Sequence, residues 1–341
     1  MEKFLKVGKI KVYLVWFDSM KAKSSAVFIQ TPDVKILIDP GAAVMQNSYP
    51  LSNKEKEFFK KEALKRIESF SKKSDIIIIT HYHYDHHTLP TKKSNFYEQK
   101  TLFIKDPNKW INRSQFFRAR KFLKRLANLN KVKFKNILES PKKLEFYDPV
   151  EDLKFKEVDK KQLKKGKKWL KDLFKLWNKE MSVCEWSKNK TSVYFADGKK
   201  VTFKNTQISF SEPLFHGIEY DRLGWVIMVN VEYKDKKVLY TSDLQGIPIK
   251  DYAQKITEIN PDLLIADGPA TYLLGYLLNQ KNLERAIENT SYIIKNIKAK
   301  TIIYDHHLLR DLNYKQKVEK IYKTASNLGK KVLTALEFLE G

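Results

Sequence analysis

The chain has few of the residues and segments that cross-link a protein or attach it to a membrane. Its 341 residues include one cysteine, Cys184, which excludes an intrachain disulfide and is typical of a reducing compartment. No stretch approaches the roughly 18 apolar residues of a membrane span, and residues 1–6 lack the apolar core of a signal peptide. Linkers rich in glycine and serine are absent as well. We therefore expect a soluble, cytoplasmic protein that avoids membranes and forms a single domain over residues 1–341.

Acidic residues are scarce relative to basic ones, and the imbalance is localised. The chain has 65 Lys and Arg against 40 Asp and Glu, a net charge of +25. Residues 91–190 alone contain 29 basic and 12 acidic residues. Apolar residues at helical spacing predict helices over 114–127 and 160–179. We interpret 91–190 as a basic, mainly helical insertion, which also holds four of the six tryptophans: Trp110, Trp169, Trp177 and Trp186.

Two interpretations of this basic segment compete. Its lysines are either the solvated faces of amphipathic helices or a phosphate-binding arm for RNA or DNA, in which interleaved aromatic rings stack on bases. The local concentration of charge favours the second, while lysine enrichment elsewhere in the chain favours the first. The candidate phosphate-binding residues are Lys164, Lys165, Lys167 and Lys168.

Histidine is also rare, yet all seven histidines lie in three short patches. The largest patch, His81-x-His83-x-Asp85-His86, directly follows the apolar run Ile76–Ile79, which predicts a buried strand. Imidazoles and carboxylates are the ligands that zinc and similar divalent metals prefer. Three imidazoles and a carboxylate crowded at one strand end need a shared partner, so the pattern predicts a metal site.

The remaining patches also follow apolar, strand-like segments. His216 follows residues 211–215 and precedes Gly217, Asp243 follows 238–242, and the pair His306 and His307 follows 301–305. Neighbouring residues of a strand point to opposite faces, so the two histidines of the pair are not expected to bind a metal equally well. We favour His306, the first of the pair. His87, adjacent to the largest patch, is expected to be structural.

These motifs, in this order, resemble the metallo-β-lactamase superfamily. The order is Asp39 within Ile36-Leu-Ile-Asp-Pro-Gly41, the His81–His86 run, His216, Asp243 and the final histidine pair. The phrases THYHYDHHT, SDLQG, DGPATYLLG and DHHLLRDL are similar to an archaeal branch of predicted metal-dependent hydrolases. The resemblance covers residues from about 10 to 90 and from about 195 to 315. It implies an α/β fold, the αββα sandwich, with metals in a groove along one edge.

The resemblance also implies a dinuclear hydrolase. One metal would be held by His81, His83 and His216, and a second by Asp85, His86 and His306 or His307, with Asp243 bridging them. Two divalent ions would supply the hydrolytic chemistry. Zinc is the first choice, and manganese, iron and nickel are the alternatives. Asp39, Asp267 and Asp305 are expected to support the ligands by hydrogen bonding. The candidate catalytic residues are Asp85, Asp243 and His307.

The substrate is the least determined property. A phosphodiester, in nucleic acid or a nucleotide, ranks first because of the basic segment. A small-molecule ester, lactone or sugar phosphate ranks second, and a non-catalytic nucleic-acid-binding protein third. Arg222 and Arg310 are candidate phosphate ligands, although pairing with the adjacent Asp221 and Asp311 is an equal alternative. A lysine-walled groove at the metals would favour a polymer, and a closed apolar pocket would favour a small ester.

Local patterns complete the expected fold. Residues 10–17, 26–31 and 34–39 read as strands, and 54–70 as an amphipathic helix leading into the Ile76–Ile79 strand. Residues 192–195 and 200–203 are expected to form a hairpin around the Asp197-Gly198 turn.

Overall fold

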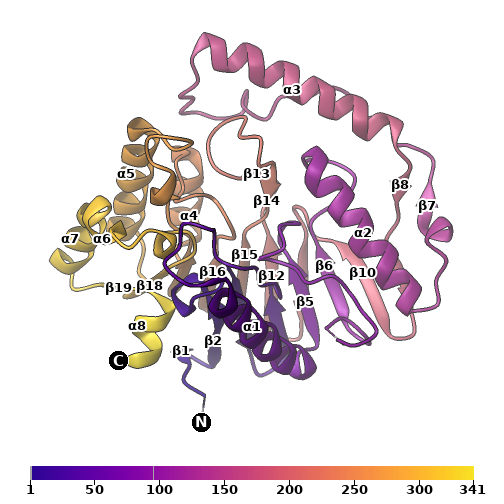
Figure 1. The fold of residues 1–341 in the computed structure, drawn as a ribbon, viewed down its shortest axis with the longest axis horizontal. Helices are drawn as coiled ribbons and strands as arrows, with labels where there is room; N and C mark the ends of the chain where they lie inside the picture. Colours follow the sequence, from indigo (N-terminus) through magenta and orange to yellow (C-terminus); the bar gives the residue numbers. More distant parts are fainter. Residues whose placement is uncertain (1, 95) are drawn as a thin grey trace.

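The computed structural model describes residues 2–94 and 96–341 and shows two large β-sheets packed face to face, with helices on the outside (Figure 1). The first sheet has the order β1-β2-β3-β4-β5-β6-β10-β9. The second has the order β11-β12-β15-β16-β17-β18-β19. The strands of the first sheet are β1 (Leu5–Val7), β2 (Ile10–Phe17), β3 (Ser25–Gln30), β4 (Lys35–Ile38), β5 (Ile76–Ile79), β6 (Thr101–Ile104), β9 (Trp186–Lys188) and β10 (Thr191–Phe195). Those of the second are β11 (Lys200–Phe203), β12 (Thr206–Phe210), β15 (Val229–Tyr233), β16 (Lys236–Tyr240), β17 (Leu263–Ala266), β18 (Thr301–Tyr304) and β19 (Lys331–Leu333).

The central strands are apolar on both faces because both faces are covered. In β5, Ile76 and Ile78 point into the core between the sheets, where they join Val229 and Ile265 of the second sheet. The alternate residues of β5 point to the other face, into the core beneath the helices. Period-two alternation with burial on both sides explains the uninterrupted isoleucine run.

The helices cover the outer faces of the sandwich. Helix α1 packs on β2 and β4 of the first sheet, while α4, α5 and α7 pack together beside the second sheet. A capping box between Ser52 and Glu55 fixes the start of α1, close to the expected helix at 54–70. The helices are α1 (Asn53–Lys73), α2 (Arg113–Leu129), α3 (Lys160–Lys179), α4 (Lys250–Ile259), α5 (Gln280–Asn296), α6 (Tyr314–Lys317), α7 (Glu319–Asn327) and α8 (Ala335–Glu340). Two further pairs of short strands are β7 (Leu138–Glu139) with β8 (Ser182–Val183), and β13 (Leu214–Phe215) with β14 (Trp225–Val226).

The predicted α/β sandwich is confirmed, and so are both helices expected in the basic segment, which are α2 and α3. The segment is not wholly peripheral, however. Its strand β6 lies inside the first sheet between β5 and β10, and α2 covers the same end of the molecule (Figure 1). The part that extends furthest is α3, which crosses the top of the molecule in that view.

The expected hairpin at residues 192–203 is wrong. Strand β10 pairs with β6 in the first sheet, and β11 pairs with β12 in the second, so Asp197-Gly198 carries the chain from one sheet to the other. Asp197 accepts hydrogen bonds from the fully buried Lys105 side chain and from the backbone N–H of Asp106 (2.6 Å). This buried ion pair holds the link in place, and it is invisible to a local turn pattern.

The tryptophans of the basic segment are engaged in packing. Trp177 is buried, and the partly buried Trp169 stacks on Trp225 with an interplanar angle of 4°. Trp110 packs against both Trp177 and Trp225. These rings anchor α3 to the sandwich, so they are not free to stack on bases. In the described part of the chain, no helix is both long and apolar enough to cross a membrane.

Candidate metal centre

The titratable residues of the motifs meet at one edge of the sandwich because the strands that carry them end there. Strands β4, β5 and β6 run parallel, as do β16, β17 and β18. Strand β2 is antiparallel to β3, which is antiparallel to β4, so β2 ends at this edge too. The loops after β5, β16 and β18 deliver His81–His87, Asp243 and the pair His306 and His307.

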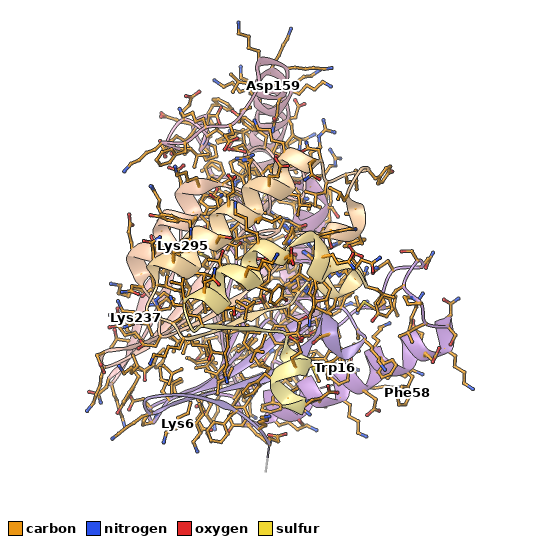
Figure 2. The ribbon with its side chains drawn as sticks, turned by 90° about the vertical axis from the view of Figure 1, so that its left-hand side faces the viewer. Lys6, Trp16, Phe58, Asp159, Lys237 and Lys295 are labelled. Atoms are coloured by element: carbon orange, nitrogen blue, oxygen red, sulfur yellow. The ribbon has the colours of Figure 1, made fainter. Side chains whose placement is uncertain are left out.

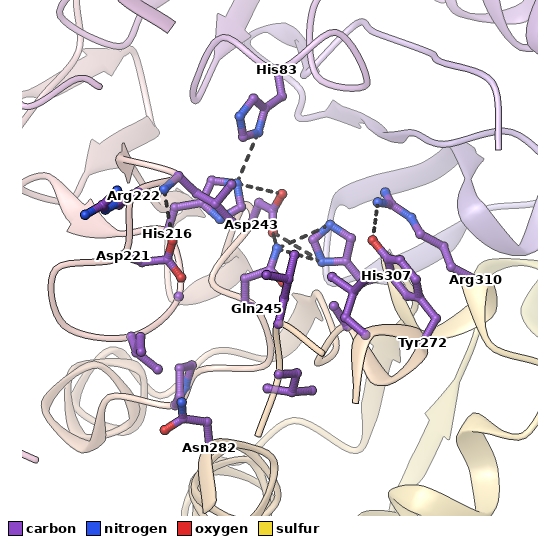
Figure 3. A pocket seen from close by; sticks show the side chains of 18 of the residues that line it. His83, His216, Asp221, Arg222, Asp243, Gln245, Tyr272, Asn282, His307 and Arg310 are labelled. Atoms are coloured by element: carbon purple, nitrogen blue, oxygen red, sulfur yellow. Dashed lines mark hydrogen bonds and ion pairs between the residues drawn. The ribbon is translucent and has the colours of Figure 1, made fainter. Parts of the chain in front are cut away.

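A first cluster contains His81, His83, His216 and Asp243, whose ligand atoms all lie within 4.8 Å of one another. His83 Nδ1 lies 3.1 Å from His81 Nε2 and 3.2 Å from His216 Nε2. His216 Nε2 is 3.0 Å from Asp243 Oδ2 (Figure 3). His216 follows β13 and lies more than 130 residues away in sequence from His81 and His83.

A second cluster contains Asp85, His86 and His306. The Nε2 atoms of His86 and His306 lie 3.1 Å apart, and His306 Nε2 is 3.9 Å from Asp85 Oδ2. Asp243 lies between the two clusters. Its Oδ2 atom is within 4 Å of imidazole nitrogens from both, at 3.9 Å from His81, 3.7 Å from His86 and 3.7 Å from His306. This is the position that a bridging carboxylate requires.

The hydrogen bonds of the second cluster suit a bound cation. His86 Nδ1 lies 2.8 Å from Asp39 Oδ2, and His306 Nδ1 lies 3.0 Å from Asp18 Oδ1. An imidazole that donates its Nδ1–H to a carboxylate presents the lone pair of Nε2 on its other side. Against the effect of burial, Asp18 raises the pKa of His306 well above its usual range, so the short contact between the two Nε2 atoms is expected to hold one positive charge, either a proton or a metal ion. The donor set, imidazoles and carboxylates only, fits divalent metals such as zinc.

Burial sets the protonation states at the first cluster. It lowers the pKa of His81 well below the usual range and that of His83 to about 3, with neighbouring imidazoles adding to the effect. Both rings are therefore neutral, as metal ligands must be. Burial opposes the charge of Asp243, but His216 and His307 hold the pKa of that carboxyl well below its usual range. Asp85 behaves alike, with its pKa lowered by His86 and Arg310 against the effect of burial.

His306 and His307 have different surroundings. His306 lies in the second cluster, whereas His307 approaches Asp243 Oδ1 at 3.4 Å and the amide of Gln245 at 3.1 Å. The backbone of His307 has a φ of 73°, which turns the chain between the two rings. His307 lines the cavity above the cluster (Figure 3). His307 also forms a group with Asp243 and His306 in which ligand atoms lie within 4.8 Å of one another, but only His306 belongs to the second cluster as well, and this favours His306 as the ligand.

Asp39 lies beneath the ligand loop and organises it. One carboxylate oxygen of Asp39 accepts a backbone hydrogen bond from Thr80 (2.8 Å), and the other accepts from the hydroxyls of Thr80 (2.6 Å) and Tyr240 (2.8 Å). Together with the contact to His86, this is the supporting arrangement expected from the sequence. His87 also lies where expected, with Nδ1 2.9 Å from the backbone oxygen of His83 and its ring against Phe122.

The two other aspartates expected to support the ligands contact backbone instead. Asp305 accepts hydrogen bonds from the N–H groups of Ser19 (3.1 Å) and Ala335 (2.8 Å). Asp267 accepts from Gly246 N–H (3.2 Å), in the loop that follows Asp243. Burial raises the pKa of Asp305 to about 6 and, with help from Asp243, that of Asp267 to about 7.

Asp18, at the end of β2, is a central residue that the sequence analysis missed. It is fully buried and contacts His306 Nδ1 (3.0 Å), Arg310 Nε (2.6 Å) and the backbone N–H groups of Ser24 (3.0 Å) and His307 (2.9 Å). Although burial disfavours the charge, Arg310 and His306 hold the pKa of Asp18 well below its usual range. The signal was available, because Asp18 directly follows the expected strand 10–17, as Asp243 follows its own strand.

The two candidate phosphate-binding arginines differ in availability. Arg310 is buried and is bonded to Asp18 and, at 3.1 Å, to Asp85, while Asp311 pairs with Lys317. Its guanidinium therefore orients Asp85 and has limited capacity for a further anion. Arg222 is exposed, and no carboxylate of the described residues lies within ion-pair distance of it; the adjacent Asp221 instead accepts a backbone hydrogen bond from Leu223 (2.9 Å).

A cavity of about 470 Å³ opens above the cluster (Figure 3). The metal-binding side contributes His83, Asp85, His216 and Asp243 to its lining. The rest of its lining combines aliphatic residues with polar and charged ones, and no lysine of the described residues takes part. The remaining lining residues are Gly217, Ile218, Asp221, Arg222, Leu223, Gln245, Pro248, Ala270, Tyr272, Leu273, Leu277, Leu278, Asn282, His307 and Arg310.

The candidate lysines lie on α3, and the side chains around Asp159, which precedes this helix, extend outward (Figure 2). Lys167 pairs with Glu151 at 2.8 Å, but Lys164, Lys165 and Lys168 are exposed and have no carboxylate partner among the described residues. Lys165 lines a shallower cavity of about 300 Å³ that also includes Arg222.

Fold and site together define a protein of the metallo-β-lactamase superfamily, whose family model matches residues 22–87. The UPF0282 protein of Sulfurisphaera tokodaii is 34% identical over 336 residues, covering 97% of this chain and 88% of the relative. That of Korarchaeum cryptofilum is 32% identical over 324 residues, covering 95% and 87%. The chain belongs to this archaeal UPF0282 family, within the superfamily that the sequence motifs indicated. The solved metallo-β-lactamase fold protein YhfI from Bacillus subtilis is similar over 91% of this chain and 88% of its own, with 14% identity and a TM-score of 0.43.

Proposed function

We propose that this protein is a hydrolase that uses two divalent metal ions, with zinc as the first choice. We propose further that its substrate is a small molecule. His81, His83 and His216 would hold one ion and Asp85, His86 and His306 the other, with Asp243 shared between them. Bound ions of this kind act as Lewis acids that lower the pKa of water and polarise the scissile bond. The surrounding residues hold the ligands in position: Asp18 orients His306, Asp39 orients His86, and Arg310 orients Asp85.

The choice of a small-molecule substrate rests on the residues that line the 470 Å³ cavity. Cavities of this size hold small molecules, and such sites are mostly apolar with a few placed polar groups. The sequence ranked a phosphodiester first because of the basic segment, but the lysines of that segment do not line this cavity. The lining therefore supports the second-ranked substrate, a small ester, lactone or phosphate ester.

The test combines metal analysis with hydrolysis. Purified protein is expected to hold close to two ions per chain, and zinc-loaded protein is expected to hydrolyse at least one member of a panel of p-nitrophenyl carboxylic esters, p-nitrophenyl phosphates and lactones. Asp243→Ala is expected to lose most of this activity, because the carboxylate that spans both clusters is removed. Near-wild-type activity of Asp243→Ala would contradict the dinuclear assignment.

A phosphodiester in RNA or DNA is the second candidate, supported by the unpaired lysines of α3. Lys165 and Arg222 share the 300 Å³ cavity, and Arg222 also lines the larger one, so the two cavities adjoin at Arg222. If the segment contacts Z phosphates, log affinity falls with log salt at a slope near −0.9Z for a duplex. Charge reversal at Lys164, Lys165 and Lys168 is expected to flatten that slope without changing metal content.

A matched control for this second candidate is charge reversal at Lys72, Lys315 and Lys323, which are exposed lysines outside α3 that pair with carboxylates. Binding to RNA and DNA is measured at several salt concentrations, including about 0.15 M. Absence of binding there, in the wild-type protein, would leave only the small-molecule substrate.

A further inference from the structure

The cavity above the metal cluster has one side that the hydrolytic chemistry does not use. The cavity lining includes five aliphatic side chains from two loops, which we call the aliphatic wall: Ile218, Leu223, Leu273, Leu277 and Leu278. The first two come from the link between β13 and β14, and the other three from residues 271–278, between β17 and α5. None of the five is a candidate metal ligand, so their grouping needs another explanation.

The 271–278 loop is held in shape by its own backbone. It begins with a 3₁₀ turn at Thr271–Leu273 and then reverses at Gly275, whose φ is +86°. The N–H groups of Leu277 and Leu278 both donate to the carbonyl of Leu273 at 3.1 Å, and Gly275 N–H donates to the carbonyl of Leu278 at 2.9 Å. A loop fixed in this way presents its side chains in one arrangement before any ligand arrives.

The loop leaves an aliphatic side chain in water at the mouth of the cavity. Leu277 is 72% exposed although it lines the cavity. Single exposed leucines are ordinary on protein surfaces. Leu277 differs because four further aliphatic residues stand beside it around the same cavity, which ends at the metal cluster. A ligand that filled the cavity would remove this apolar surface from water.

We propose that the aliphatic wall binds an apolar acyl or aryl group of the substrate, so that the bond cleaved joins this group to the polar part held at the cluster. The substrate class is an amphiphilic small ester. The inference rests on the proposed function for the bond that is cleaved, but the binding of the apolar group does not depend on catalysis. Arg222, exposed at the rim, is placed to receive an anionic group of such a molecule.

A binding series tests the wall without reference to activity. Butanoate, hexanoate and octanoate are titrated into the purified full chain by calorimetry, with and without zinc. Affinity is expected to rise with chain length, at most about fourfold per methylene, as for the transfer of a methylene group out of water. Leu277→Ser is expected to weaken octanoate binding about three- to tenfold and butanoate binding less.

The control variant lies on the same loop. Tyr276→Ser changes a side chain that is 83% exposed and that does not line the cavity, so octanoate binding is expected to stay unchanged. Leu278→Ala provides a second change within the wall, and thermal unfolding of each variant shows that the fold persists. Equal affinity for all three acids, or equal effects of Leu277→Ser and Tyr276→Ser, would overturn the inference.

Hydrolysis of p-nitrophenyl acetate, butyrate and octanoate by the zinc-loaded protein separates the two proposals. A kcat/KM that rises with acyl length and falls for Leu277→Ser supports both. Hydrolysis that is independent of length and of Leu277 overturns the aliphatic wall and leaves the hydrolase standing. Length-dependent binding of the acids without hydrolysis of any substrate in the panel supports the wall and counts against the hydrolase.

Discussion

His306 and His307 show how much the surroundings of a single residue decide. They are neighbours in sequence, yet only His306 has one nitrogen tied to a carboxylate, Asp18, and the other facing a second imidazole. His307 contacts Asp243 and Gln245 from the cavity side. The two residues should therefore respond differently to substitution.

His306→Ala is expected to lower the metal content from about two ions per chain to about one, because the second cluster loses an imidazole. His307→Ala is expected to keep both ions and to reduce kcat, since it changes the cavity side of Asp243. Metal content is measured by elemental analysis of protein dialysed against trace zinc. A loss of one ion in His307→Ala with full content in His306→Ala would reverse the assignment.

Asp18→Asn tests the residue that the sequence analysis missed. The amide cannot replace a charged partner of His306, so zinc affinity at the second cluster is expected to fall about 10- to 100-fold. Removing one partner of the buried pair with Arg310 should also destabilise the fold, by about 3–5 kcal/mol. Zinc titration and urea unfolding measure the two effects. Asp311→Asn, which removes a carboxylate that pairs with Lys317 and touches no ligand, is the control.

At the scale of elements, the links between strands are held by buried charge. The link after β6 carries Lys105 and Asp106, and the link between β10 and β11 carries Asp197. The Lys105 ammonium pairs with Asp197, and Asp106 lies beside them with its carboxylate accepting the N–H of Asn108 (2.8 Å). Burial and the nearby charge of Asp197 raise the pKa of Asp106.

This raised pKa predicts a pH-dependent effect of Asp106→Asn. A carboxyl whose pKa is raised on folding contributes stability that is fully present below its unfolded pKa of about 4 and is lost as the pH rises through the folded value. Relative to the wild type, Asp106→Asn is therefore expected to gain stability as the pH rises from about 4 towards 8. Urea unfolding across this range measures the difference. Asp172→Asn, at an exposed carboxylate on α3, serves as the surface control, and a flat difference for Asp106→Asn would contradict the prediction.

At the scale of the whole molecule, the metal cluster is a property of both sheets. The first sheet and its loops provide Asp18, Asp39 and the His81–His86 run, while the second provides Asp243 and His306. Metal binding requires the two halves to be packed together, so it should stabilise the folded state against the unfolded one.

Zinc is expected to raise the unfolding free energy by about 4 kcal/mol at a free concentration 1,000 times the Kd. The effect should weaken below about pH 6, where protons compete with zinc for His216 and His306, because Asp243 and Asp18 raise the pKa of these two imidazoles against the effect of burial. Thermal unfolding with zinc and with chelator, at pH 7.5 and pH 5.5, measures it. The double variant His83→Ala with His86→Ala should show no stabilisation by zinc at either pH. Full stabilisation in this variant would show that the cluster is not the zinc site.

The sequence by itself determined the superfamily and the composition of the cluster. Strands of buried aliphatic residues followed by histidine or aspartate are local patterns that the sequence shows directly. The order of these motifs along the chain indicated the fold. Helices α1, α2 and α3 followed from apolar spacing for the same reason, because an amphipathic helix is specified within its own residues.

Only the tertiary structure decided which residues meet. The hairpin at 192–203 is replaced by a link between the sheets, which an ion pair with the sequence-distant Lys105 holds. The role of Asp18 depends on the packing of the two sheets, which places the end of β2 in the first sheet beside the end of β18 in the second. The tryptophans of the basic segment pack inward, against Trp225 of another element. The lining of the cavity likewise comes from loops far apart in the chain. Such contacts arise from packing between elements, which local spacing does not encode.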